Sequence, residues 1–164
     1  MSLLLKLSQV LLLSWSLFSV QTGFATQLQL INNVQYESQL AKEKNLPILI
    51  LFSIEHCPYC RLVKEDFLIP MLISGNYKEK VIIRELNIDN SPMITGLSGS
   101  QQSAASYAYS MGVSLYPTMV FINHQGCILS ETIKGVNTPS MFGGRIDQAI
   151  DEANKKIKTA ELKC

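Results

Sequence analysis

The sequence lacks the positive charge that binding to nucleic acid or to an anionic membrane surface requires. Its 164 residues contain 14 Lys and Arg against 13 Asp and Glu, and no block of basic residues stands out. Attraction to such polyanions depends on clustered cations, so we expect no nucleic-acid partner. The sequence also shows no internal repeat and no domain linker, and its length allows one domain with a sizeable core but not two.

Cysteine and histidine are scarce as well, with four and two residues. Cys57 and Cys60 form a C-x-x-C pair, whereas Cys127 and Cys164 stand alone, so no second pair is present to complete a zinc site. We expect neither a metal nor an organic cofactor. Three interpretations of the pair are open at this point: a redox-active dithiol, a structural disulfide, or half of a zinc site.

The first 25 residues have a different character from the rest of the chain. They contain one charged residue, Lys6, and an apolar run over residues 7–20, followed by the small residues Gly23 and Ala25. This pattern predicts a secretory signal peptide cleaved after Ala25. The apolar run is shorter than the roughly 20 residues that a spanning helix needs, which favours cleavage over the alternative of an uncleaved single-span anchor.

We therefore predict a signal peptide at residues 1–25 and one domain at residues 26–164. Export changes the interpretation of the cysteines, because disulfides persist in oxidising compartments and a C-x-x-C pair there is more often redox-active or structural than metal-binding. We predict the bacterial periplasm as the location, since eukaryotic secreted domains of this size usually carry more cysteines.

The mature chain alternates between helical and strand patterns, in the order α-β-α-β-α-β-β-α. The expected helices are residues 34–44, 58–73, 101–112 and 139–162, and the expected strands are residues 48–54, 80–89, 116–123 and 127–135, with a loop over 90–100. The strand over 48–54 is a continuous apolar run, typical of a strand buried on both faces, and the strand over 80–89 is expected to be buried as well. The last two are joined by a short turn, which predicts a hairpin. The fold class is therefore α/β, with a mixed sheet that combines a parallel pair and an antiparallel hairpin.

The C-x-x-C pair lies where a buried strand gives way to a helix. Pro58 suits the first helical position, which places Cys57 at the helix start and Cys60 one turn further on the same face. The unpaired N–H groups and partial positive charge of a helix N-terminus favour a thiolate and lower the pKa of Cys57 from about 8.5. His56 adds positive charge when it is protonated. We predict that Cys57 is the attacking thiol and Cys60 the resolving thiol.

With these landmarks, the sequence resembles the thioredoxin superfamily over roughly residues 33–160. The matching segments are ILILFSI, CPYC, VIIRELNID, MGVSLYPTMVFINHQG and the later Gly135. The resemblance implies a thioredoxin fold, a mixed central sheet flanked by helices. It also implies a cis bond before Pro117, facing the C-x-x-C pair, and docking of a substrate chain on the backbone of Tyr116. Without the resemblance, Pro117 would merely open a strand.

The long insert after VIIRELNID is most similar to the periplasmic thioredoxin-like group, which includes SoxW-type proteins and resembles the C-terminal domain of the membrane thiol reductase DsbD. This implies a thiol–disulfide oxidoreductase that acts on protein thiols and disulfides and is recycled by a membrane thiol reductase or oxidase. The alternatives are a binding or chaperone-like protein with an incidental C-x-x-C and a glutaredoxin-like, glutathione-dependent reductase. We find no glutathione-binding pattern.

The sequence departs from the superfamily beside the active pair. Leu51 stands where cytosolic thioredoxins place a buried Asp that assists proton transfer to the resolving thiol, and His56 replaces the usual Trp. Glu55 and His56 are then the nearest candidates for that proton transfer, with simple solvation as the alternative for each. Pro58 and Tyr59, between the cysteines, are expected to modulate the pair.

Cys127 and Cys164 carry less information. The sequence leaves open whether they are bonded to each other, free and inert, or engaged in an intermolecular link.

Overall fold

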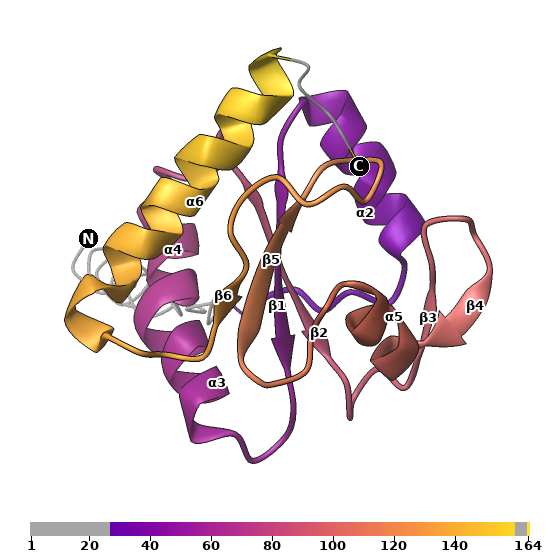
Figure 1. Cartoon of the computed structure of the whole chain (residues 1–164), viewed down its shortest axis with the longest axis horizontal. Coiled ribbons are helices and arrows are strands. Elements are labelled where there is room, and N and C mark those ends of the chain that lie inside the picture. The colour runs from indigo at the N-terminus through magenta and orange to yellow at the C-terminus, as the bar shows by residue number, and fades with distance from the viewer. Residues whose placement is uncertain (1–26, 160–163) are drawn as a thin grey trace, which may run out of the picture.

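The computed structural model describes residues 27–159 and Cys164. The predicted signal peptide, its cleavage point and the alternative anchor lie outside these residues. Figure 1 shows a central sheet with helices on both of its faces. The helices are α2 (Val34–Lys44), α3 (Pro58–Leu62), η1 (Val63–Leu68), α4 (Ile69–Ser74), α5 (Ala104–Ser110) and α6 (Pro139–Thr159). The strands are β1 (Ile48–Ser53), β2 (Ile82–Asn87), β3 (Met93–Thr95), β4 (Gln101–Ser103), β5 (Thr118–Ile122) and β6 (Ile133–Lys134).

The main sheet has the strand order β2-β1-β5-β6. β1 pairs in parallel with β2 and antiparallel with β5, and β5 pairs antiparallel with β6. The expected combination of a parallel pair and an antiparallel hairpin is therefore confirmed. The crossover from β1 to β2 runs through α3, η1 and α4, as a parallel connection requires.

The sheet separates two apolar clusters, because successive side chains of a strand point to opposite faces. Leu49 and Leu51 of β1 belong to the cluster beneath η1 and α6, whereas Ile50 and Phe52 belong to the cluster beneath α2 and α5. All six residues of β1 are buried. This burial on both faces explains why the strand is a continuous apolar run in the sequence.

The helix expected over residues 58–73 is present, but its middle is wider than an α-helix. Residues Val63–Leu68 form a π-helical segment, in which the N–H of Ile69 donates to the carbonyl of Lys64 five residues earlier. Pro70 is the second residue after this segment, and the helix continues through it to Ser74. The wider turn accommodates the proline, which has no N–H and whose ring clashes with a regular preceding turn.

The region after β2 differs most from the prediction. The expected loop at 90–100 contains β3, which pairs with β4 in a separate two-stranded ribbon. The helix expected from residue 101 begins only at Ala104, because Ser103 is its N-cap and accepts a hydrogen bond from the N–H of Ser106. The strand expected over 127–135 is reduced to an isolated bridge at Ile128 and the two residues of β6.

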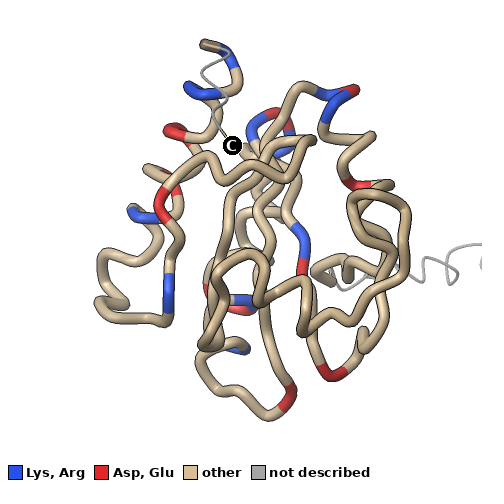
Figure 2. Tube along the Cα trace, turned by 45° about the vertical axis from the view of Figure 1, so that its right-hand side comes forward, with Lys and Arg blue, Asp and Glu red and all other residues tan. Residues whose placement is uncertain are grey.

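Charged residues are spread thinly along the chain. Figure 2 shows Lys and Arg interspersed with Asp and Glu along the described trace, without a block of either sign. Within residues 27–159, no helix combines the length and apolar character that crossing a membrane demands.

Candidate active site

Cys57 and Cys60 are joined by a disulfide at the start of α3. Cys57 is the N-cap of this helix and has extended backbone angles. Its Sγ accepts a hydrogen bond from the N–H of Cys60 at 3.1 Å, in the position that a capping oxygen usually takes. Cys57 is partly exposed, whereas Cys60 is only 5% exposed. The geometry thus leaves one cysteine partly exposed and buries the other.

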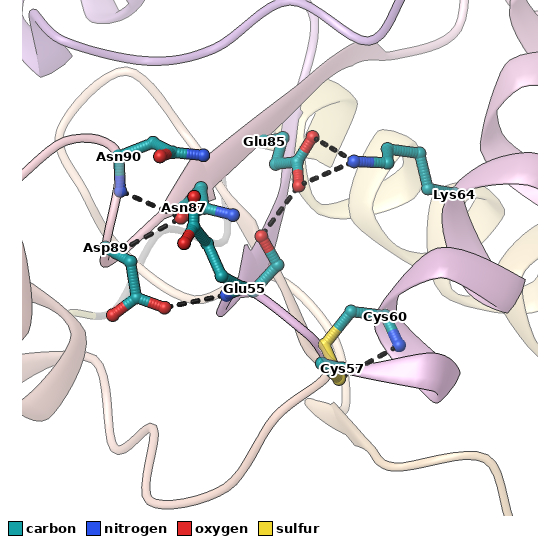
Figure 3. A network of polar contacts seen from close by, with 9 residues as sticks. Glu55, Cys57, Cys60, Lys64, Glu85, Asn87, Asp89 and Asn90 are labelled. Carbon is teal, nitrogen blue, oxygen red and sulfur yellow. Dashed lines mark hydrogen bonds and ion pairs between the residues drawn. A yellow bond between two sulfur atoms is a disulfide. The ribbon is translucent and has the colours of Figure 1, made fainter.

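The turn before Cys57 is held by the end of β2. The N–H of Glu55 donates to Oδ2 of Asp89 at 2.7 Å, and Oδ1 of Asn87 accepts from the N–H groups of Asp89 and Asn90 (Figure 3). His56 has a positive φ of 52°, in the left-handed region. The side chains of Glu55 and His56 are both exposed.

The structure also contains a buried acid near the cysteine pair, and the sequence had not indicated it as a site residue. Glu85, on β2, is 3% exposed. Its Oε1 accepts a hydrogen bond from Oγ of Ser53 at 2.7 Å, and Nζ of Lys64 lies 3.3 Å from both carboxylate oxygens. Figure 3 shows Lys64 reaching Glu85 from the helix that begins at the disulfide. The signal for it in the sequence is a pair of charged residues, Arg84 and Glu85, in the middle of a strand expected to be buried.

The cysteine pair and the buried ion pair of Glu85 and Lys64 line one pocket of ≈ 590 Å³. Its lining includes the disulfide, the buried acid and its lysine, and the exposed turn: Glu55, His56, Cys57, Pro58, Cys60, Lys64 and Glu85. Tyr59, which is 60% exposed, and the pair Tyr116 and Pro117 are not among its lining residues. The buried acid and the disulfide therefore line a common pocket, whereas Tyr59, Tyr116 and Pro117 are not part of its lining.

The Tyr116–Pro117 peptide bond is cis, as the resemblance implied. Pro117 directly precedes β5, whose Thr118 is the register partner of Phe52 on β1. It therefore lies at the end of the sheet where β1 leads into the disulfide turn, the lower end in Figure 1. Tyr116 is partly buried. Its desolvation and, secondarily, the negative charge of Asp89 raise the pKa of its phenol.

The other two cysteines are bonded to each other. A disulfide joins Cys127, which is 5% exposed, to the last residue, Cys164. Of the three alternatives left open by the sequence, the structure contains the intramolecular bridge. Among the described residues, no three His, Cys, Asp or Glu side chains are grouped so as to hold a metal ion.

Comparison with known proteins agrees with this geometry. Residues 34–150 match the model of the thioredoxin-like domain family. Among solved structures, a poplar thioredoxin h is 17% identical with a TM-score of 0.55, and the match covers 77% of this chain and 98% of that one. The thioredoxin of Fasciola hepatica is 16% identical with a TM-score of 0.52, covering 77% and 99%. No curated protein sequence matches the chain.

A thioredoxin fold with a C-x-x-C pair at the start of the helix after β1 defines a thioredoxin-like protein. Since the family match spans most of the chain, the protein belongs to the thioredoxin-like domain family. The predicted fold class is thus confirmed. Leu51, fully buried on β1, remains the departure noted in the sequence.

Proposed function

We propose that this protein is a periplasmic thiol–disulfide oxidoreductase in which Cys57 attacks and Cys60 resolves. The observation that carries the proposal is the unequal burial of the two cysteines. A partly exposed Cys57 caps a helix N-terminus, where a thiolate is stabilised, and a buried Cys60 lies within bonding distance. A structural disulfide needs neither the partly exposed cysteine nor the pocket beside it.

The chemistry is an exchange of two electrons without a cofactor. The Cys57 thiolate attacks one sulfur of a substrate disulfide, and the other substrate sulfur leaves as a thiolate that takes up a proton. The Cys60 thiol then loses its proton and attacks the Cys57 sulfur, which releases the second substrate thiolate. The enzyme ends as the Cys57–Cys60 disulfide that the structure contains, and the substrate has gained two electrons and two protons. The reverse sequence oxidises a dithiol.

Protein thiols and disulfides are the proposed substrates, docked along the backbone of Tyr116 and Pro117 beside the pair. The family resemblance and the cis bond support this role. A membrane thiol reductase or oxidase is the proposed recycling partner, as in the SoxW-type and DsbD-like group that the sequence resembles. The N-terminal signal-peptide pattern supports the periplasmic location.

The roles of the two cysteines can be tested by separate serine variants. Cys57→Ser should abolish reduction of a model protein disulfide, because no attacking thiolate remains. Cys60→Ser should accumulate mixed disulfides with substrate proteins, because the resolving step is lost. Turnover and non-reducing gel mobility measure the two effects, and the double variant Cys127→Ser, Cys164→Ser is the control, because it removes two cysteines that take no part and leaves no free thiol.

Full turnover by Cys60→Ser with a dithiol reductant, without trapped complexes, would show that the assignment is wrong. A reaction that requires glutathione would instead point to glutaredoxin-like chemistry. Absence of exchange by the wild-type protein would favour a binding role for the fold.

A further inference from the structure

We propose that Glu85 is the proton acceptor and donor for Cys60, a catalytic carboxylate supplied by β2. This inference rests on the proposed function, and it names the group that makes the resolving step fast. Neither Glu55 nor His56, the nearest candidates in the sequence, is buried. Glu85 combines burial, a carboxylate and a place in the pocket that contains both cysteines.

The strand register places Glu85 at a definite position. Its Cα partner on β1 is Leu51, and paired residues of parallel strands project to the same face of the sheet. Leu51 belongs to the apolar cluster beneath η1 and α6, so the Glu85 side chain emerges on the face that the disulfide-bearing helix covers. β1 has Leu51 where cytosolic thioredoxins have a buried Asp, and the neighbouring strand β2 places the acid Glu85 in register with that position.

The contacts of Glu85 stabilise its carboxylate in the interior and fix its orientation. The hydroxyl of Ser53 donates to one of its oxygens at 2.7 Å, and the Lys64 ammonium lies 3.3 Å from both. Burying a carboxylate carries a desolvation penalty even when it is paired, and an apolar residue at such a site is often at least as stable. Buried ion pairs that line a cleft next to reactive groups are candidates for catalysis on this ground.

Lys64, the ion-pair partner of Glu85, lies on the same helix as the resolving Cys60. It lies four residues after Cys60, hence one turn further along the same face, and on the π-helical segment Val63–Leu68. Its side chain is 33% exposed, whereas the side chain of Glu85 is 4% exposed. The pair therefore extends from the solvent-exposed side of the pocket that it shares with the disulfide into the interior (Figure 3).

The proposed step is balanced. In the mixed disulfide, the Cys60 thiol gives its proton to the Glu85 carboxylate, directly or through water in the shared pocket. The Cys60 sulfur forms a bond to the Cys57 sulfur, and the bond between Cys57 and the substrate sulfur breaks. The substrate leaves as a thiolate and takes a proton from solvent. When the disulfide is reduced again, the protonated Glu85 returns the proton to the Cys60 thiolate.

The test separates the two chemical steps in one experiment. Reduced protein is mixed with an aromatic disulfide whose thiol product is coloured, in a background carrying Cys127→Ser and Cys164→Ser. The first coloured thiol reports attack by Cys57, and the second reports attack by Cys60. Glu85→Gln should leave the first phase unchanged and slow the second at least about tenfold near neutral pH, since general-base catalysis contributes roughly 10²–10⁴-fold.

The chain offers a matched control on the other face of the sheet. Glu37, 3% exposed, is paired with Arg84 through an Nε–Oε2 distance of 2.9 Å, away from the pocket of the disulfide. Glu37→Gln makes the same chemical change in a buried ion pair, so it reproduces any general loss of stability. We expect both of its phases to match those of the background protein, with circular dichroism showing that each variant is folded.

The pH dependence distinguishes a proton acceptor from a structural residue. With Glu85 present, the second phase should vary little with pH below the thiol range, because an internal group takes the proton. In Glu85→Gln it should rise about tenfold per pH unit up to about pH 8.5, the ordinary thiol value, so that the variants converge at high pH.

If the second phase of Glu85→Gln follows the pH profile of the background protein, the proposal for Glu85 is overturned. A normal first phase in the same experiment would leave the proposed function intact. If Glu85→Gln does not fold, the background protein, which retains Glu85, provides the test. A second-phase rate in that protein that rises in proportion to hydroxide concentration over the neutral range would also overturn the proposal. Absence of the first phase in the background protein would refute the proposed function and this inference together.

Discussion

At the scale of single residues, the acidity of the thiol that we propose as the attacker should depend on its position more than on the charges of its neighbours. Cys57 lies at a helix N-terminus, whose N–H groups do not titrate, and beside the exposed imidazole of His56. Two unit charges about 4 Å apart in water interact by only about 1 kcal/mol, whereas one pKa unit corresponds to about 1.36 kcal/mol. The exposed neighbour can therefore contribute less than one unit.

We predict that His56→Asn raises the apparent pKa of the Cys57 thiol by less than about one unit and leaves it below about 8.5. Asparagine is chosen because it tolerates the positive φ of 52° at this position. The measurement is the rate of alkylation against pH for the reduced protein without Cys127 and Cys164. Glu55→Gln, a change at the other exposed neighbour, is the control. A wild-type value at or above about 8.5 would show that no activated thiolate exists.

At the scale of elements, the sequence predicted those helices and strands that have a clear local pattern of apolar residues. The strand expected over 48–54 and the helix expected over 34–44 are confirmed by β1 and by α2, which the structure caps with Asn33 and Asn45. The ribbon of β3 and β4 was missed because each strand has only three residues, and the Ser- and Gly-rich segment has no alternation to detect. Glu85 was missed because its importance depends on its register with Leu51, which no local pattern specifies.

The disulfide between Cys127 and Cys164 ties the chain end after α6 to the turn after β5. That turn is itself well connected, because Oδ1 of Asn123 accepts the N–H of Cys127 at 2.9 Å and the hydroxyl of Ser38 on α2 donates to the carbonyl of His124. The two cysteines are 37 positions apart, against three for Cys57 and Cys60. A longer closed loop restricts the unfolded chain more.

We predict that replacing Cys127 and Cys164 by serine lowers the free energy of unfolding by roughly 3–4 kcal/mol, from the loop-closure relation. Replacing Cys57 and Cys60 should cost about half as much. Denaturant unfolding of the oxidised proteins measures both. An equal or smaller loss for the Cys127 and Cys164 variant would contradict a stabilising role for this bridge.

At the scale of the whole molecule, alkaline pH should weaken the fold through one buried phenol. Tyr107, on α5, is 4% exposed, its ring centroid lies 6.2 Å from that of Phe52 on β1, and burial raises its pKa to about 12 from 10.0. The folded state thus keeps the proton where the unfolded state releases it. Stability from this group is complete below pH 10 and is lost as the pH rises from about 10 to about 12.

We predict that this group alone lowers the free energy of unfolding by about 1 to 1.5 kcal/mol between about pH 8 and pH 11, from the size of the pKa difference. Tyr107→Phe should remove that part of the pH dependence, because the ring still packs but no proton can be lost. Tyr109→Phe is the matched control, since Tyr109 lies on the same helix and is 83% exposed. Denaturant unfolding at the two pH values gives the comparison. Equal losses of stability in the wild type and in Tyr107→Phe would mean that other groups control the alkaline transition and that the helix-to-sheet contact does not need the neutral phenol.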